Sequence, residues 1–366
     1  MIKKFIKKEP VLVFAWTAAV ISGFAVPLNK DYIDYIDFRT LGLLFCLMCV
    51  TGGLKKLGVF RTAGEKLLLL VKNSIQLELI LVMLCFFSSM LLTNDVALIT
   101  FVPFAIEILD MAGLSKKLIF VVSMQTVAAN LGSMLTPIGN PQNIYIYTKY
   151  GVSAAEFFCS VFPYSVVSFI FISAVIIFQK NKSSININLN FSEEKIDIKK
   201  FVLYIMLFLL AVLSVGRIIP VKIIFWLFVV LFSIVDREIL KTIDYNLLFT
   251  FVGFFVFIGN MGKIEIFRSF IKSVIVGNEI ITSVISSQIL SNVPSALLLS
   301  GFTDNWKGLL IGVNIGGLGT LIASMASLIS YKFFVNTMPK EKGGYIKFFT
   351  LINLIMLIIL LAVSKM

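Results

Sequence analysis

Long apolar runs are the feature that most restricts how this chain can fold. Runs of about 16 to 22 apolar residues recur along it, close to the roughly 20 that an α-helix needs to cross the hydrocarbon core. Strands of a membrane barrel would instead alternate over about ten residues. Charged residues make up only 14% of the sequence, against roughly 25% in soluble domains. We therefore predict an all-α polytopic membrane protein.

The excess of basic residues fits a membrane protein better than a nucleic-acid-binding one. Lys and Arg outnumber Asp and Glu by 32 to 20, but they lie in short loops beside apolar segments, as the positive-inside rule describes. The chain has no histidine. Cys46 and Cys49 have CxxC spacing, yet they lie in an apolar segment without a second pair, which argues against a zinc or redox site.

One ionisable residue lies where lipid is expected. Residues 75–109 are almost continuously apolar except at Thr93, Asn94 and Asp95. A carboxylate in such a segment is costly and indicates a functional site. The length suits two short helices, so we predict a re-entrant hairpin with this triplet at its tip, where protein or water must surround the polar backbone. The alternative is that Asp95 merely caps the helix that begins at Val96.

Similar interruptions occur at three other places. In the second half, Ser291 and Asn292 interrupt an apolar stretch and predict a second hairpin over 279–303. Two crossings are broken: 118–147 by two prolines and two glycines, and 307–334 by a glycine-rich segment. Both residue types break a helix and free its backbone carbonyls and amides.

The chain also repeats itself. Residues 37–60 align without gaps on 244–267, and the hairpin tips and broken helices then align in the same order. The predicted segments are a first repeat over 1–178 (hairpin 75–109, broken helix 118–147), a cytoplasmic linker over 179–200, a connecting span over 201–216, and a second repeat over 217–366 (hairpin 279–303, broken helix 307–334).

An odd number of crossings precedes the second copy, so the two copies are predicted to be inverted. The N-terminus is expected in the cytoplasm, with about nine spanning helices in the plasma membrane. Most of the 32 basic residues then lie on the cytoplasmic side, in agreement with the positive-inside rule.

Inverted repeats with paired, interrupted helices are typical of secondary transporters. The helix N-termini at a hairpin tip or a broken helix offer free amides and partial positive charge to an anion. Carbonyls, together with Thr, Ser and Asn oxygens, suit a hard cation such as sodium. An anion and its driving cation can therefore share a site that contains no buried Arg or Lys.

Four motifs occur in order along the chain. They are Thr93-Asn94-Asp95, TPIGNPQN at 136–143, SNVPS at 291–295 and GGLGT at 316–320. Over nearly the whole chain they resemble the ion transporter superfamily, in particular its citrate transporter-like branch, which includes divalent anion:sodium symporters and arsenite/antimonite permeases. The resemblance implies a scaffold domain, often the interface of a homodimer, and an elevator-type transport domain that carries both hairpins.

The resemblance also implies which residues bind. The implied substrate-binding residues are Thr93, Asn94, Ser291, Asn292 and Pro294. The candidate ion-coupling residues are Asp95, Thr136, Gly139, Asn140, Asn143, Gly319, Thr320 and Ser324. Asn and Ser in a broken helix can equally satisfy the backbone of that helix.

Asp95 and Val293 replace the hydroxyl groups expected of a dicarboxylate symporter. A carboxylate beside an anion site repels a dianion unless sodium or a proton neutralises it. Asp95 is therefore the candidate coupling residue, for protons or for sodium.

These features predict a secondary active transporter of small citrate- or dicarboxylate-like anions, coupled to sodium or protons. The alternatives are an arsenite/antimonite efflux permease and a sodium/proton antiporter in which Asp95 carries the exchange. An enzyme is not expected, because the chain lacks HExxH-like and GxSxG motifs. The expected partners are the anion, sodium or protons, the lipid bilayer and a second copy of the chain. No nucleic acid is expected, and no cofactor or metal beyond bound sodium.

Overall fold

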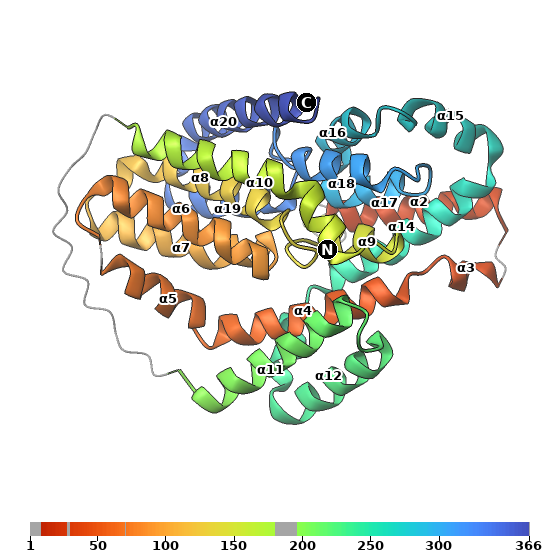
Figure 1. Cartoon of the computed structure of the whole chain (residues 1–366), viewed down its shortest axis with the longest axis horizontal. Helices are drawn as coiled ribbons and strands as arrows, with labels where there is room; N and C mark the ends of the chain where they lie inside the picture. The colour runs from red at the N-terminus through yellow and green to blue at the C-terminus, as the bar shows by residue number, and fades with distance from the viewer. Residues whose placement is uncertain (1–8, 28–29, 70, 180–195, 366) are drawn as a thin grey trace.

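Helices are the only regular elements that the structure shows. The structure is a computed structural model that describes residues 9–27, 30–69, 71–179 and 196–365. Within these ranges no strand occurs, and the helices form one packed assembly (Figure 1).

Six of the described helices are long and apolar enough to cross a membrane. They are Phe38–Lys56, Ser74–Leu91, Ala154–Ile177, Ile198–Val215, Tyr245–Lys263 and Pro339–Val363. Pro10–Ala25 and Val221–Val235 are apolar but shorter, and Glu265–Ile275 forms with Glu279–Leu290 a pair bent by 113°. The prediction of an all-α polytopic membrane protein is confirmed, and the count of about nine spans stays a prediction.

The order of helices in the first half recurs in the second. The first half contains α2 (Pro10–Ala25), α3 (Asp31–Asp34), α4 (Phe38–Lys56), α5 (Val59–Leu68), α6 (Ser74–Leu91), α7 (Asn94–Met111), η1 (Ser115–Lys117), α8 (Leu118–Ser133), α9 (Pro141–Lys149) and α10 (Ala154–Ile177). After α11 (Ile198–Val215), the second half contains α12 (Val221–Val235), α13 (Arg237–Thr242), α14 (Tyr245–Lys263), α15 (Glu265–Ile275), α16 (Glu279–Leu290), α17 (Asn292–Leu299), α18 (Trp306–Ile315), α19 (Met325–Thr337), η2 (Pro339–Glu341) and α20 (Lys342–Val363). This order supports the predicted repeat, and the inverted orientation of the copies in the bilayer stays a prediction.

The closest correspondence is between α4 and α14. Each has 19 residues and follows an aspartate that caps it: Asp37 accepts from the Thr40 amide, and Asp244 accepts from the Leu247 amide. An aspartate at this position satisfies one of the amides that the first turn leaves free. The aligned segments therefore begin the same element in the same way.

The two halves of each broken helix pack against different hairpins. α8 packs against its own hairpin, α6 and α7, whereas α9 packs against α4, α17 and α18. Likewise, α18 packs against α16 and α17, whereas α19 packs against α7 and α8. Each broken helix therefore connects the two hairpins, and the chain changes sides at the breaks, residues 134–140 and 316–324.

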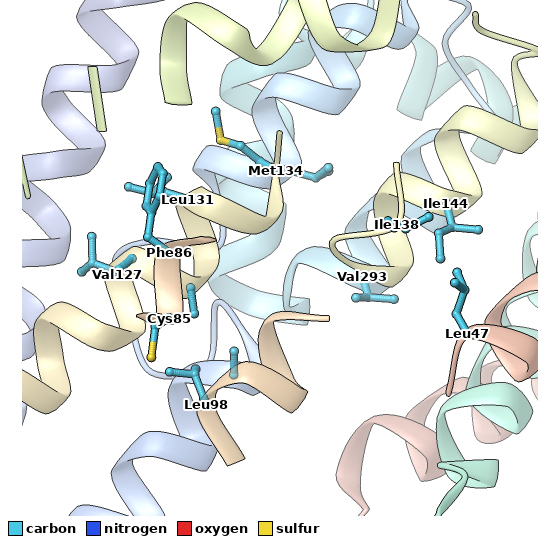
Figure 2. Packing of buried hydrophobic residues seen from close by; sticks show 14 of the residues in the cluster. Leu47, Cys85, Phe86, Leu98, Val127, Leu131, Met134, Ile138, Ile144 and Val293 are labelled. Atoms are coloured by element: carbon cyan, nitrogen blue, oxygen red, sulfur yellow. The ribbon is translucent and has the colours of Figure 1, made fainter. Parts of the chain in front are cut away.

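The first hairpin is held against α8, in which every residue from Val121 to Ser133 is buried. Figure 2 shows Cys85 and Phe86 of α6 beside Leu131 of α8. Close van der Waals packing of this kind holds helices together in a membrane, where the lipid is as apolar as the side chains. On another side of the molecule, α11 and α12 both pack against α4 (Figure 1).

A buried ion pair joins the base of the first hairpin to the following turn. The Glu78 carboxylate on α6 is fully buried and lies 3.0 Å from the Lys117 ammonium of η1. Gln179 contacts both side chains, since it donates to Glu78 (2.8 Å) and accepts from Lys117 (2.6 Å). The pair fixes the end of α10 against the hairpin base.

Replacing Lys117 should destabilise the protein much more than replacing its neighbour. We expect Lys117→Ala to lower the free energy of unfolding by about 3 kcal/mol, because it leaves the Glu78 carboxylate buried without a counter-ion. Lys116→Ala, at an exposed position, should change it by less than about 0.5 kcal/mol. Thermal unfolding in detergent measures both, and equal effects would contradict the role of the pair.

Candidate functional site

Each hairpin tip is hydrogen-bonded to the break in its own repeat. The Asn94 amide at the first tip donates to the Gly139 carbonyl at 3.1 Å. The Asn292 amide at the second tip donates to the Ala323 carbonyl at 3.0 Å. Both contacts join a hairpin turn to non-helical backbone, so the two tips lie beside the two breaks.

The side chains of the two tip asparagines also make equivalent contacts. The Asn94 side-chain oxygen accepts from the Asp95 amide, and the Asn292 oxygen accepts from the Val293 amide, each at 3.0 Å. Both asparagines are almost fully buried. Their oxygens thus satisfy amides of the first helical turn, which have no partner within the helix.

The first tip excludes the interpretation of Asp95 as a helix cap. α7 begins at Asn94, and the cap is Thr93, whose hydroxyl accepts from the Val96 amide. Asp95 lies in the first turn, and its carboxylate accepts no hydrogen bond from the described residues. The second tip has a different backbone, because Ser291 adopts a φ of 76° and its hydroxyl donates to the Ala323 carbonyl.

A network of buried amides joins the two repeats. The Asn130 oxygen accepts from Asn94 (2.9 Å) and from the hydroxyl of Ser324 (3.1 Å). In the other repeat, the Asn314 oxygen accepts from Asn140 (3.0 Å). Asn130 and Asn314 are the residues that the repeat alignment pairs, and each bonds to the break of the opposite repeat. Buried polar groups of this kind need hydrogen-bond partners, and here the partners are other side chains of the same network.

Side-chain amides also satisfy the carbonyls that the breaks leave free. The Asn143 amide donates to the carbonyls of Ser133, Met134 and Thr136 at 3.0–3.3 Å, and its oxygen accepts from Asn314 at 2.7 Å. At the second break this role falls to a residue of the hairpin itself. Gln288 donates to the Gly316 and Leu318 carbonyls at 2.9 Å and accepts from the Thr320 amide at 3.0 Å.

Glycine is required at one position in each break. A Cβ on Gly139 would lie 2.0 Å from the Ser133 carbonyl oxygen, so no side chain fits there. Gly319 has a φ of 103°, which side chains rarely tolerate, and a Cβ there would lie 2.5 Å from Gln288 Oε1. These two glycines, predicted for ion coupling, shape the breaks through the backbone.

Two neighbouring cavities open at the tips. The smaller, of about 60 Å³, lies between both tips, the start of α2 and the start of α14. The larger, of about 380 Å³, adjoins it and extends along α4. Asp95, Pro141, Asp244 and Leu247 line both cavities, which therefore adjoin each other beside the first tip, in a mainly apolar surround.

The predicted site residues fall into two groups around these cavities. The residues that line one or both of them are Thr93, Asn94, Asp95, Asn292, Pro294 and Ser324. The residues that line neither cavity are Ser291, Thr136, Gly139, Asn140, Asn143, Gly319 and Thr320. In the second group the contacts of Asn140 and Asn143 hold the backbone of the breaks and the two repeats together.

Gln142 is a binding candidate that the sequence reasoning missed. Its side chain is 1% exposed and lines the smaller cavity. Neither its amide nitrogen nor its oxygen has a hydrogen-bond partner in the part of the chain that the structure describes. A buried amide with two free groups facing a cavity is available to a ligand. Its place inside the TPIGNPQN motif was the available signal.

Asp244 is the second candidate that was missed. It caps α14, with its carboxylate 2.9 Å from the Leu247 amide, and it faces both cavities together with Asp95. Among the described residues, no Lys or Arg lines the smaller cavity, and Glu9 is a further acidic residue in its lining. In the larger one, Lys56 is already paired with Asp236 at 2.9 Å, and Lys55 is the other cation. In the smaller cavity the charged groups among the described lining residues are thus all carboxylates, which favours a proton or a cation over a bare anion.

Comparison with known proteins agrees with these features. The sequence profile described as citrate transporter matches residues 2–304. The chain belongs to the citrate transporter family. This membership confirms the resemblance noted from the four motifs, and the chain is therefore a membrane transporter of this group.

Similar members of this group occur in distant organisms. The chain is 32% identical to the uncharacterized transporter MJ0456 of Methanocaldococcus jannaschii, over 92% of this chain and 91% of that one. It is 27% identical to the inner membrane protein YbiR of Escherichia coli, over 85% and 84%. A shorter match, 33% identical over 42% of this chain and 33% of the relative, is to the silicon efflux transporter LSI3 of Oryza sativa subsp. japonica.

Replacing Gln142 tests whether its side chain is available to a ligand or is needed for the stability of the protein. We expect Gln142→Leu to leave the free energy of unfolding unchanged or to raise it by about 1 kcal/mol, because it removes a buried amide that has no partner. The control is Gln125→Leu, since the Gln125 amide donates to the Leu81 and Phe101 carbonyls. It should lower the free energy of unfolding by about 1–2 kcal/mol. Thermal unfolding compares them, and equal losses would assign Gln142 a structural role.

Proposed function

We propose that this chain is a secondary active transporter of small citrate- or dicarboxylate-like anions, coupled to a proton or sodium ion that binds at Asp95. The observation that supports this most directly is the Asp95 carboxylate itself, which faces the cavity at the hairpin tips and accepts no hydrogen bond from the described residues. A charged carboxylate at this depth is unfavourable without a counter-ion. A coupling ion supplies that partner.

The second carboxylate determines the order of binding in this proposal. Asp95 and Asp244 both line the smaller cavity, and none of its described lining residues is basic. A bare dianion would be repelled, whereas an anion that follows a bound proton or sodium ion would not. The coupling ion therefore binds first, and the anion then contacts the free amide of Gln142 and the tip residues Asn94 and Asn292.

The packing of the broken helices supports a transport domain that moves as one body. α9 and α19 each cross to the opposite hairpin, so neither hairpin can move far without the other. In this proposal the scaffold contains α4, α11, α12 and α14 and carries Asp244. The Asp95 carboxylate then moves away from Asp244 during transport. We further propose a plasma-membrane location with the N-terminus in the cytoplasm.

A second candidate function is efflux of an uncharged hydroxylated acid. Two observations favour it: none of the described residues that line the smaller cavity is basic, and part of the chain matches a silicon efflux transporter. An arsenite/antimonite efflux permease would handle a solute of the same class. In the remaining alternative, a sodium/proton antiporter, Asp95 carries the exchange and no anion binds.

Transport in proteoliposomes tests the proposal. Uptake of labelled citrate and succinate is measured under an imposed proton or sodium gradient, for the native chain, Asp95→Asn and Asp110→Asn. We expect Asp95→Asn to abolish gradient-driven accumulation, because an amide cannot take up a proton near neutral pH and carries no negative charge to balance a sodium ion. Asp110→Asn is the matched control, since Asp110 lies exposed at the other end of α7, where it accepts from Ser115. It should transport like the native chain.

The same vesicles distinguish the alternatives. Movement of arsenous or silicic acid, without uptake of citrate or succinate, would show that the transported solute is an uncharged acid and not an anion. Sodium-dependent proton movement that Asp95→Asn stops, with no solute transported, would establish the antiporter. Accumulation of citrate that Asp95→Asn leaves intact would overturn the assignment of coupling to Asp95.

A further inference from the structure

A second large hollow lies apart from the hairpin tips. This groove, of about 1030 Å³, runs between α4, α12 and α14, and it shares no lining residue with the two cavities at the tips. Its walls are mainly apolar and aromatic. Phe38, Trp226 and Phe249 line it and are 60%, 63% and 55% exposed.

Three cations gather at one end of this groove. They are Arg39 in the first turn of α4, Arg217 in the turn between α11 and α12, and Lys222 in the first turn of α12. Within the described ranges none of them forms an ion pair. The Asp37 carboxylate, which also caps α4, attracts the Arg39 charge and offsets part of it. Because three cations face this one carboxylate, this end of the groove carries a net positive charge.

Hydrogen bonds hold the guanidinium groups in place without neutralising them. Arg217 donates to the carbonyls of Gly151 (2.7 Å) and Tyr147 (3.1 Å), and Arg39 donates to that of Ser214 (3.4 Å). The Nε of Arg39 is buried and has no partner among the described residues. Arg39 and Arg217 also repel each other. The unpaired Nε–H donor of Arg39, together with the two guanidinium charges that repel each other, favours a bound anion.

We propose that this groove binds an anionic phospholipid, with its phosphate at Arg39, Arg217 and Lys222 and an acyl chain along the aromatic wall. Basic pockets between membrane helices are suited to such headgroups. A water-soluble anion would leave the apolar wall uncovered, and a second copy of the chain would have to supply an acidic group to the cations. Trp226 near the charged end is typical of the membrane interface. The proposal does not depend on the transported substrate.

Native mass spectrometry of the full chain tests the charged end. The protein is titrated in mild detergent with phosphatidylglycerol or phosphatidylcholine of equal acyl length. We expect the native chain to prefer phosphatidylglycerol by about tenfold, and Arg39→Gln and Lys222→Gln each to weaken its binding roughly fivefold, without affecting phosphatidylcholine. The control is Lys307→Gln, at an exposed lysine outside the groove, which should bind both lipids like the native chain.

Further measurements test the apolar wall and the alternative that a second copy of the chain occupies the groove. Val252→Trp, which fills the groove without changing a charge, should weaken phosphatidylglycerol binding. Equal affinity of the native chain for the two lipids, or the same loss in Lys307→Gln as in Lys222→Gln, would overturn the proposal. A native dimer that excludes phosphatidylglycerol and cross-links through Trp226→Cys, with the exposed Cys159 replaced by serine, would assign the groove to a second copy instead.

Discussion

The structure of the candidate site depends on how unpaired backbone is satisfied at the two helix breaks. Non-helical backbone within a membrane is tolerated only where protein or water supplies hydrogen bonds. Here Asn143 and Gln288 donate to the carbonyls of the first and second break, and the amides of Asn94 and Asn292 pair the tips with the same breaks. The breaks thus fix where both hairpin tips lie.

The same breaks allow each broken helix to change partners. Because α9 and α19 pass to the opposite hairpin, the breaks lie where the two repeats meet, and the Asn130 and Asn314 side chains bond across that junction. The packing that satisfies the backbone also connects the hairpins mechanically. The similar geometry of the two tips and the connection between the two hairpins therefore have one physical origin.

The chemistry of the cavity follows from which polar groups remain unpaired. Most of the amides near the breaks bond to one another, whereas Gln142 and the Asp95 carboxylate do not. Unpaired groups beside a cavity are the ones available to a ligand. Asp244 lines the same space as Asp95, and none of the described residues around the smaller cavity is basic, so the described part of the site is acidic.

The sequence by itself determined the helical class, the hairpins and the breaks, because apolar run length, proline and glycine act locally. It also identified Asp95, since an ionisable residue in an apolar segment is visible without a fold. Only the tertiary structure showed that Asn143 serves the backbone, that Gln142 is unpaired and that Asp244 faces Asp95. Such roles depend on contacts between segments far apart in the chain, and residue type and spacing do not encode those distances.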